Sequence, residues 1–226
     1  TSGTLNADWP CITGDGSKVF FYDQRTGDIK IVNWAGGSMT TLQANHVGAG
    51  EEVSIESWVD PANGSDWVIV GKACSGEISR ININNPSQYV KLWSCGSPCP
   101  SYGNGIALSL DGIRLGAMWD LNGNFASGVG TITNNTVKRH TTWIGCGVSM
   151  PADNSYRVSF AAGEIRVSTG ELPYQTIPAV SKAMTWVQSN GKKTSCHEWF
   201  EMSSHRWTNH PDFLTVCLYS KIGRAH

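Results

Sequence analysis

The stretch from Ser203 to Val216, SSHRWTNHPDFLTV, gathers two histidines, an arginine and a tryptophan within a few residues. His205 and His210 have side chains that can act as acid or base near neutral pH. Arg206 could hold an acidic ligand through two parallel hydrogen bonds, and Trp207 offers a large apolar ring. These four residues are therefore candidates for ligand binding.

Catalysis or metal binding at the two histidines would need further partners. A zinc site takes at least three protein ligands; residues 196–198, Cys-His-Glu, lie nearby, but no recognised spacing connects them to His205 and His210. An acid–base pair would need a carboxylate, for which Glu201 and Asp212 are available. The pattern favours a structural turn over a metal site, and we predict no catalytic residue, no metal and no cofactor.

Tryptophans are the second group of candidates, because aromatic rings stack on the apolar C–H faces of sugars. Four of the 10 tryptophans fall in expected loops or strand ends: Trp34, Trp93, Trp143 and Trp199. Core packing is the simpler explanation for each of them. Trp143 and Trp199 are kept with the four residues of the first stretch as candidate ligand-binding residues.

The elements that must position these residues follow a repeat. Five segments share a short apolar run, a turn rich in Asp, Asn and Gly, and a strand of alternating apolar residues. They are CITGDGSKVFFYD, SWVDPANGSDWVIVG, ALSLDGIRLGAMWD, VSMPADNSYRVSF and HRWTNHPDFLTVCL, with turn aspartates Asp15, Asp66, Asp111, Asp153 and Asp212. The intervals of roughly 40–60 residues are close to the length of a propeller blade.

A second hairpin follows the first in three of these units, with turns expected at Gly27, Gly76 and Gly163. Strand, turn, strand, glycine turn and strand make an antiparallel meander. Residues 177–189 hold no clean helical period, so we expect loop or strand there. In the last segment Asn209 and Pro211 suit a hairpin turn, which explains most of that stretch without any chemistry.

Composition and motifs exclude several functions. The 17 basic and 18 acidic residues leave no positive surplus, so we predict no nucleic-acid partner. No apolar run is long enough to span a bilayer. Residues 120–124, DLNGN, lack the later ligands of a calcium loop and favour a plain turn. The sequence holds no phosphate loop, no Gly-x-Ser-x-Gly motif and no His-Glu-x-x-His motif.

The seven cysteines match no zinc signature. Buried thiols and disulfides are both open, and cysteines in Gly/Ser/Pro-rich loops favour disulfides in a secreted protein. Because seven is an odd number, one cysteine would be left as a free thiol or without its disulfide partner in this sequence. Sequons at Asn63 and Asn134 agree with a secretory route.

The repeats carry a family resemblance. The unit GDGSKVFFYDQRTGDIKIVNWAGG resembles TolB-like β-propeller repeats, and SSHRWTNHPDFLTV resembles the His-Arg-Trp-Ser-Asn-His-Pro repeat of a poorly characterised secreted propeller group, mostly of environmental bacteria. The resemblance covers most of residues 8–220 and implies a ring of six blades.

We therefore predict an all-β fold: one β-propeller domain over residues 1–221, with five visible blades of a six-bladed ring and further strands beyond the C-terminus. Residues 222–226 do not continue the repeat and are expected to be a non-native tail. A secreted or cell-surface, non-catalytic module that binds glycan or protein is the favoured function. A propeller-type polysaccharide hydrolase or lyase and a protein-interaction scaffold are the alternatives. The oligomeric state stays open.

Overall fold

The structure is a computed structural model of the whole chain. It describes residues 7–48, 53–72, 77–94, 106–121, 124–133, 136–143, 146–151, 158–161, 165–168, 175–176, 185–187, 193–195, 200–207 and 214–220. Side chains are described for most of these residues up to 117 and for residues 130–132 and 149–151. Statements about side chains below refer to these residues.

Four antiparallel sheets of four strands make up most of the fold. Sheet 1 holds β1 (Ala7–Ile12), β2 (Lys18–Asp23), β3 (Asp28–Asn33) and β4 (Thr40–Gln43). Sheet 2 holds β5 (Val53–Val59), β6 (Asp66–Lys72), β7 (Glu77–Asn82) and β8 (Tyr89–Ser94). Sheet 3 holds β9 (Ile106–Leu108), β10 (Arg114–Leu121), β11 (Asn124–Thr133) and β12 (Thr136–Trp143). Sheet 4 holds β13 (Cys146–Ser149), β14 (Val158–Ala161), β15 (Ile165–Ser168) and β16 (Gln175–Thr176).

Two pairs of strands follow these four sheets. They are β17 (Thr185–Val187) with β18 (Lys193–Ser195), and β19 (Phe200–Trp207) with β20 (Leu214–Ser220). Every described pairing is antiparallel between strands that are neighbours in sequence, so each four-stranded sheet is a meander. The described part of the chain holds no helix, which confirms the all-β prediction.

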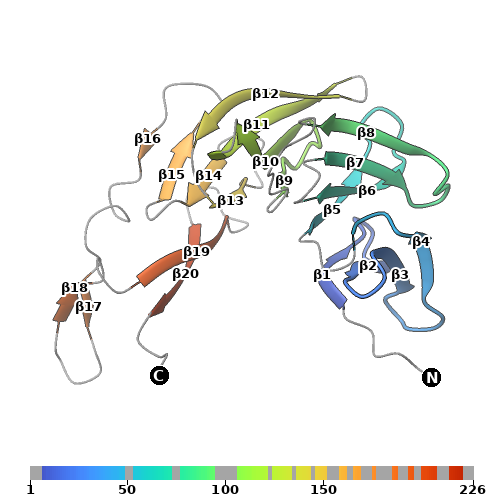
Figure 1. Cartoon of the computed structure of the whole chain (residues 1–226), viewed down its shortest axis with the longest axis horizontal. Helices are drawn as coiled ribbons and strands as arrows, with labels where there is room; N and C mark the ends of the chain where they lie inside the picture. The colour runs from blue at the N-terminus through green and yellow to red at the C-terminus, as the bar shows by residue number, and fades with distance from the viewer. Residues whose placement is uncertain are drawn as a thin grey trace.

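The sheets follow one another along an arc, from sheet 1 through sheets 2, 3 and 4 to the β19–β20 pair (Figure 1). Their first strands, β1, β5, β9, β13 and β19, line the concave side, and each contacts the first strand of the next sheet. The fourth strands lie on the convex side. First strands that meet around a common axis are typical of a β-propeller.

Alternation along the strands of sheet 2 explains how neighbouring sheets pack face to face. One set of its side chains, including Val53, Ile55 and Val70, joins Phe20 and Tyr22 of sheet 1 in one buried cluster. The opposite set, including Trp67, Ile69 and Ile78, joins Ile106 and Leu115 of sheet 3 in a second cluster. Because a strand points successive side chains to opposite faces, sheet 2 is buried on both faces, as a sheet inside a propeller must be.

The five repeated segments each span the first two strands of a unit: β1–β2, β5–β6, β9–β10, β13–β14 and β19–β20. The predicted second hairpins are present as β2–β3, β6–β7 and β14–β15. Within residues 177–189 the structure describes a short strand, Thr185–Val187. A propeller-like fold is thus established, whereas the number of blades and the closure of a ring stay predictions.

The turn between the first and second strands, called the corner here, has the same structure in sheets 1 and 3. In corner 1 (residues 13–18), Asp15 Oδ1 accepts from Thr13 Oγ1 at 2.6 Å and from Ser17 N at 2.9 Å. In corner 3 (residues 109–114), Asp111 Oδ1 accepts from Ser109 Oγ at 2.6 Å and from the N–H of residue 113 at 3.0 Å. The aspartates therefore act as turn residues.

The prediction that Asp66 is the matching turn residue of sheet 2 is wrong. Asp66 is the first residue of β6, and corner 2 consists of residues 60–65. Asn63 takes the turn role there, because its Oδ1 accepts from Ser65 N at 2.9 Å and the following Gly64 has φ 72°. The sequence misled because the Asx-Gly pair of corner 2, Asn63-Gly64, stands just before Asp66, which opens the next strand.

Candidate functional site

The three described corners lie on one side of the molecule, called the corner face here. A Cβ on Gly14 of corner 1 would lie 3.3 Å from Val59 Cγ2, at the end of β5. In corner 3, Gly112 O accepts a hydrogen bond from Trp58 Nε1 at 2.9 Å. Both neighbouring corners thus contact the end of β5, where corner 2 begins.

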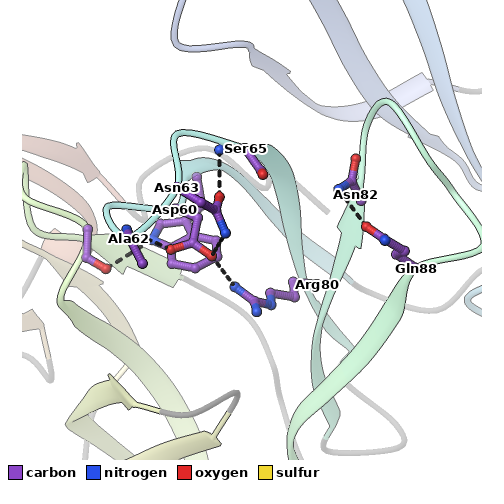
Figure 2. Close-up of polar contacts among 9 residues, drawn as sticks. Asp60, Ala62, Asn63, Ser65, Arg80, Asn82 and Gln88 are labelled. Atoms are coloured by element: carbon purple, nitrogen blue, oxygen red, sulfur yellow. Dashed lines mark hydrogen bonds and ion pairs between the residues drawn. The ribbon is translucent and has the colours of Figure 1, made fainter.

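Corner 2 is fixed by a buried arginine (Figure 2). Arg80 Nη1 lies 3.5 Å from Asp60 Oδ2, and the guanidinium stands 4.6 Å from the ring centre of Trp58 and 4.2 Å from that of Trp67. Burial lowers the pKa of Arg80, and the charge of Asp60 opposes that shift. Since aromatic rings and a carboxylate surround it, this cation stabilises the packing of sheet 2 rather than meeting a ligand.

The connection between β7 and β8 is held in a similar way. Asn82 Nδ2 donates to Gln88 Oε1 at 2.8 Å (Figure 2), and Asn82 Oδ1 accepts from the backbone N–H groups of Asn84 and Asn85. These bonds fix Ile83 and Pro86, which face sheet 1 across a groove.

That groove lies on the corner face, between the outer strands of sheet 1 and the β7–β8 connection, and has a volume of about 280 Å³. Its lining consists of Lys18, Ile31, Val32, Asn33, Ser38, Thr40, Thr41, Leu42, Ile83 and Pro86. Hydroxyl and amide groups alternate with aliphatic side chains, and Lys18 is the only charged residue. Trp34, directly after Asn33, is 67% exposed.

Asp15 lies in corner 1 near Lys18, but its carboxylate accepts hydrogen bonds from other residues of that corner. Hydrogen bonds from Thr13 and from the backbone and side chain of Ser17, with a smaller contribution from the charge of Lys18, lower the pKa of Asp15 to about 2. Asp15 is therefore ionised at neutral pH, and its oxygens point into the turn. No ion pair of Lys18 occurs among the described side chains.

A second polar cluster, called the His46 network here, joins sheets 1 and 2. His46, in the chain between β4 and β5, places Nε2 3.2 Å from Ser79 Oγ, and its ring meets Tyr89 edge-on with centroids 5.3 Å apart. Tyr89 donates to Glu77, which also lies 2.9 Å from Lys72 Nζ. Glu77 and Lys72 flank the β6–β7 connection, so this ion pair lies at the end of sheet 2 opposite corner 2.

The His46 network has the residue types of a catalytic dyad but not the access. Burial and nearby Lys72 lower the pKa of His46 to about 4, while Glu77 opposes the shift. Burial alone would raise the pKa of Glu77, yet hydrogen bonds from Lys91, Tyr89 and Lys72 hold it at about 2. Ser79 is fully buried, so its hydroxyl cannot reach a substrate. The network therefore links the two sheets.

The residues predicted from sequence lie at separate places. His205, Arg206 and Trp207 end β19, the first strand of the last pair, and their pairing partners are Val216, Thr215 and Leu214. Trp143 ends β12, a fourth strand, at the edge away from the corners. His210 and Trp199 lie outside the described residues. His205, Arg206 and Trp207 are thus neighbours on one strand, and Trp143 lies on a different sheet. A ligand-binding role for all six candidates stays a prediction.

Sequence reasoning missed the groove. The sequence predicts that Trp34 and Trp93 lie in loops or at strand ends. In the structure Trp34 is exposed, while Trp93 is partly buried against the second core cluster. The usable signal was the run that follows Trp34, AGGSMTT, where small and hydroxyl residues replace the apolar alternation of a strand. Nothing in the sequence showed that Ile83 and Pro86 would form the opposite wall.

Three further features concern cysteines, metal ligands and membrane spans. Cys11 forms no disulfide, and its Sγ lies 4.0 Å from Glu56 Oε2; for the other cysteines, disulfides stay a prediction. Among the described residues, no three His, Cys, Asp or Glu side chains are grouped as metal ligands. No helix in the described part is long and apolar enough to cross a membrane.

Comparisons with known proteins support the fold. No protein-family model and no curated protein matches the sequence. Among solved structures, a Bacteroides uniformis protein named as a candidate 6-phosphogluconolactonase aligns with TM-score 0.55 and 16% identity over 76% of this chain and 54% of its own. A puromycin-hydrolyzing peptidase of Mycobacterium tuberculosis aligns with TM-score 0.55 and 13% identity over 85% of this chain and 34% of its own.

These likenesses show a β-propeller-like fold and no activity, because both identities are far too low to carry function. The chain spans about half the length of the first of these proteins and a third of the second. TolB from Acinetobacter baumannii aligns at TM-score 0.47, so membership of the TolB-like group stays a prediction.

Proposed function

We propose that this protein is a non-catalytic glycan-binding module whose binding site is the groove on the corner face. The observation that carries the proposal is the groove itself: aliphatic walls, hydroxyl and amide groups between them, and an exposed tryptophan, Trp34, directly after the lining residue Asn33. Sugars present the same combination of apolar C–H faces and hydroxyl groups.

Each part of the site matches one need of a sugar ligand. Asn33, Ser38 and Thr40 can exchange hydrogen bonds with sugar hydroxyls. Ile83 and Pro86 offer an apolar wall, and Trp34 offers a ring on which a second sugar unit can stack. The hydrogen bonds of Asn82 hold the wall in place before a ligand arrives, which reduces the entropy lost on binding.

The lining does not favour the rival enzyme. Glycoside hydrolysis commonly uses two carboxylic acids that flank the scissile bond, and none of the ten lining residues is Asp or Glu. A polysaccharide hydrolase or lyase would need a different site, such as the end of β19, where His205 and Arg206 lie.

A protein-interaction scaffold is the second candidate, and one observation favours it. Four aliphatic side chains at the ends of first strands and in corner 3 are exposed on the corner face: Ile12, Val59, Leu110 and Ile113. Exposed apolar side chains that gather on one face are typical of interaction surfaces. A secreted or cell-surface location is part of the glycan proposal, and the loop cysteines and the two sequons support it.

A glycan array probed with the whole chain, followed by calorimetric titration of the best oligosaccharide, tests the proposal. Trp34→Ala should weaken binding by roughly tenfold, the loss expected when a stacking aromatic worth about 1–1.5 kcal/mol is removed. Leu110→Ala is the matched control, because Leu110 is 69% exposed on the same face but does not line the groove. Equal affinity in both variants and the wild type, or no binding to any glycan, would refute the proposal.

A further inference from the structure

We infer that the groove selects an anionic saccharide and that Lys18 is the residue that recognises the negative charge. This inference rests on the proposed function and adds the chemical class of the ligand. The shared chemistry is an anionic group on a sugar ring, either the carboxylate of a uronic acid or a sulfate ester.

Lys18 is held in position by corner 1. Its backbone N–H donates to Thr13 Oγ1 at 3.0 Å, and its carbonyl accepts from Thr13 N at 2.9 Å. Val19, the next residue, pairs with both Ile12 and Val32, so the chain is fixed on either side of Lys18. The half-buried side chain therefore leaves a rigid backbone and reaches the groove.

Lys18 differs from the other lysines whose side chains are described. Lys30 Nζ lies 2.6 Å from Asp28, and Lys72 and Lys91 lie 2.9 Å and 2.7 Å from Glu77. For Lys18 no carboxylate lies within ion-pair distance among the described residues. Among the described residues Lys18 is thus a lysine outside any ion pair, although its charge does interact with that of Asp15 over a longer distance.

The rest of the groove lining carries no negative charge. Apart from Lys18, every lining residue is neutral; the carboxylate of Asp15 lies outside the lining and accepts hydrogen bonds from Thr13 and Ser17. A single cation in a concave, partly apolar site acts on a ligand more strongly than on an open surface, because less water screens it. A carboxylate or sulfate beside Lys18 Nζ would form a charge-assisted hydrogen bond.

The experiment titrates the whole chain with three oligosaccharides of equal length: neutral, uronic-acid and sulfated. The wild type should bind at least one anionic probe about tenfold more tightly than the neutral one, and added salt should reduce that preference. Lys18→Met should bring the ratio of anionic to neutral affinity close to one, whereas Lys18→Arg should retain the preference of the wild type. Arg25→Met is the control, because it removes an exposed cation from the β2–β3 turn, away from the groove.

The outcomes separate the two proposals. Equal affinity of the wild type for all three probes overturns the inference and leaves the glycan-binding proposal in place, and so does a preference that Lys18→Met retains. Binding of none of the probes, in a chain that also fails on the glycan array, overturns both. Loss of neutral and anionic binding alike in both Lys18 variants would assign Lys18 a structural role and overturn the inference. Preference for one anionic probe over the other supports it and identifies the group.

Discussion

Two glycines of the corners offer a direct test of how sheets 2 and 3 pack. Gly16 of corner 1 and Gly112 of corner 3 have nearly the same backbone, with φ 72° and 69°. An L-residue with a Cβ is strained in this left-handed conformation by roughly 1–2 kcal/mol. Replacing either glycine with alanine should therefore cost about that much from backbone strain alone.

The surroundings of the two glycines differ. A Cβ on Gly16 would meet no heavy atom within 4 Å, whereas a Cβ on Gly112 would lie 2.8 Å from Trp58 Nε1 and 3.2 Å from Val59 O. Trp58 cannot easily retreat, because its Nε1 donates to Gly112 O and its ring packs on Arg80. Overpacking of this kind costs about 1–3 kcal/mol. We therefore expect Gly112→Ala to destabilise the protein by about 2–5 kcal/mol, against about 1–2 kcal/mol for Gly16→Ala.

Urea unfolding of both variants, followed by tryptophan fluorescence, measures the difference. The decisive quantity is the gap between the two free energies of unfolding, since the backbone strain cancels in it. A gap near zero, with unchanged m-values, would mean that corner 3 does not press on Trp58. The face-to-face packing of sheets 2 and 3 at this point would then be wrong.

Two further predictions concern buried charged or titratable groups. Because the fold holds the pKa of His46 at about 4, below the ordinary 6.5, the unfolded chain binds more protons between these values. The contribution of His46 to the free energy of unfolding should thus be fully present above pH 6.5. The free energy of unfolding should fall by about 2 kcal/mol by pH 5, as measured by urea unfolding at both pH values. His46→Gln should abolish most of that fall; an unchanged pH profile would contradict the role of His46. Arg80→Met should cost about 2–4 kcal/mol in the same assay, because it removes two ring contacts and leaves Asp60 without its cation. Adding Asp60→Asn should recover part of the loss, and no recovery would show that the ion pair contributes little.

Local patterns in the sequence were sufficient to predict the strands and most turns of the sheets. The alternation of Leu115 and Ala117, and of Phe20 and Tyr22, places those side chains on buried faces. The Asp-Gly pairs of corners 1 and 3 form the expected turns with positive φ. In corner 2 the same reasoning failed, because two candidate turn residues, Asn63 and Asp66, stand close together and only the strand register shows that Asn63 holds the turn.

The candidate site was harder to predict, because it depends on residues that are distant in sequence. Trp34 and Trp93 look alike in the sequence, yet one is exposed and the other is covered by its neighbours. Likewise, Lys72 and Lys91 meet Glu77 from a neighbouring strand, and the residues around each lysine in the sequence do not show this. Arg80 could have been taken for a ligand-binding residue; the rings of Trp58 and Trp67 make it part of the core.

The sequence by itself determined the all-β class, the recurring first hairpin and the antiparallel meander, because strand periodicity and turn chemistry act over a few neighbouring residues. Only the tertiary structure decided which polar and aromatic side chains face solvent, where the groove lies and which lysine has no carboxylate partner among the described residues. These properties arise where one sheet packs against the next, and the chain sets that packing through contacts between segments separated by tens of residues.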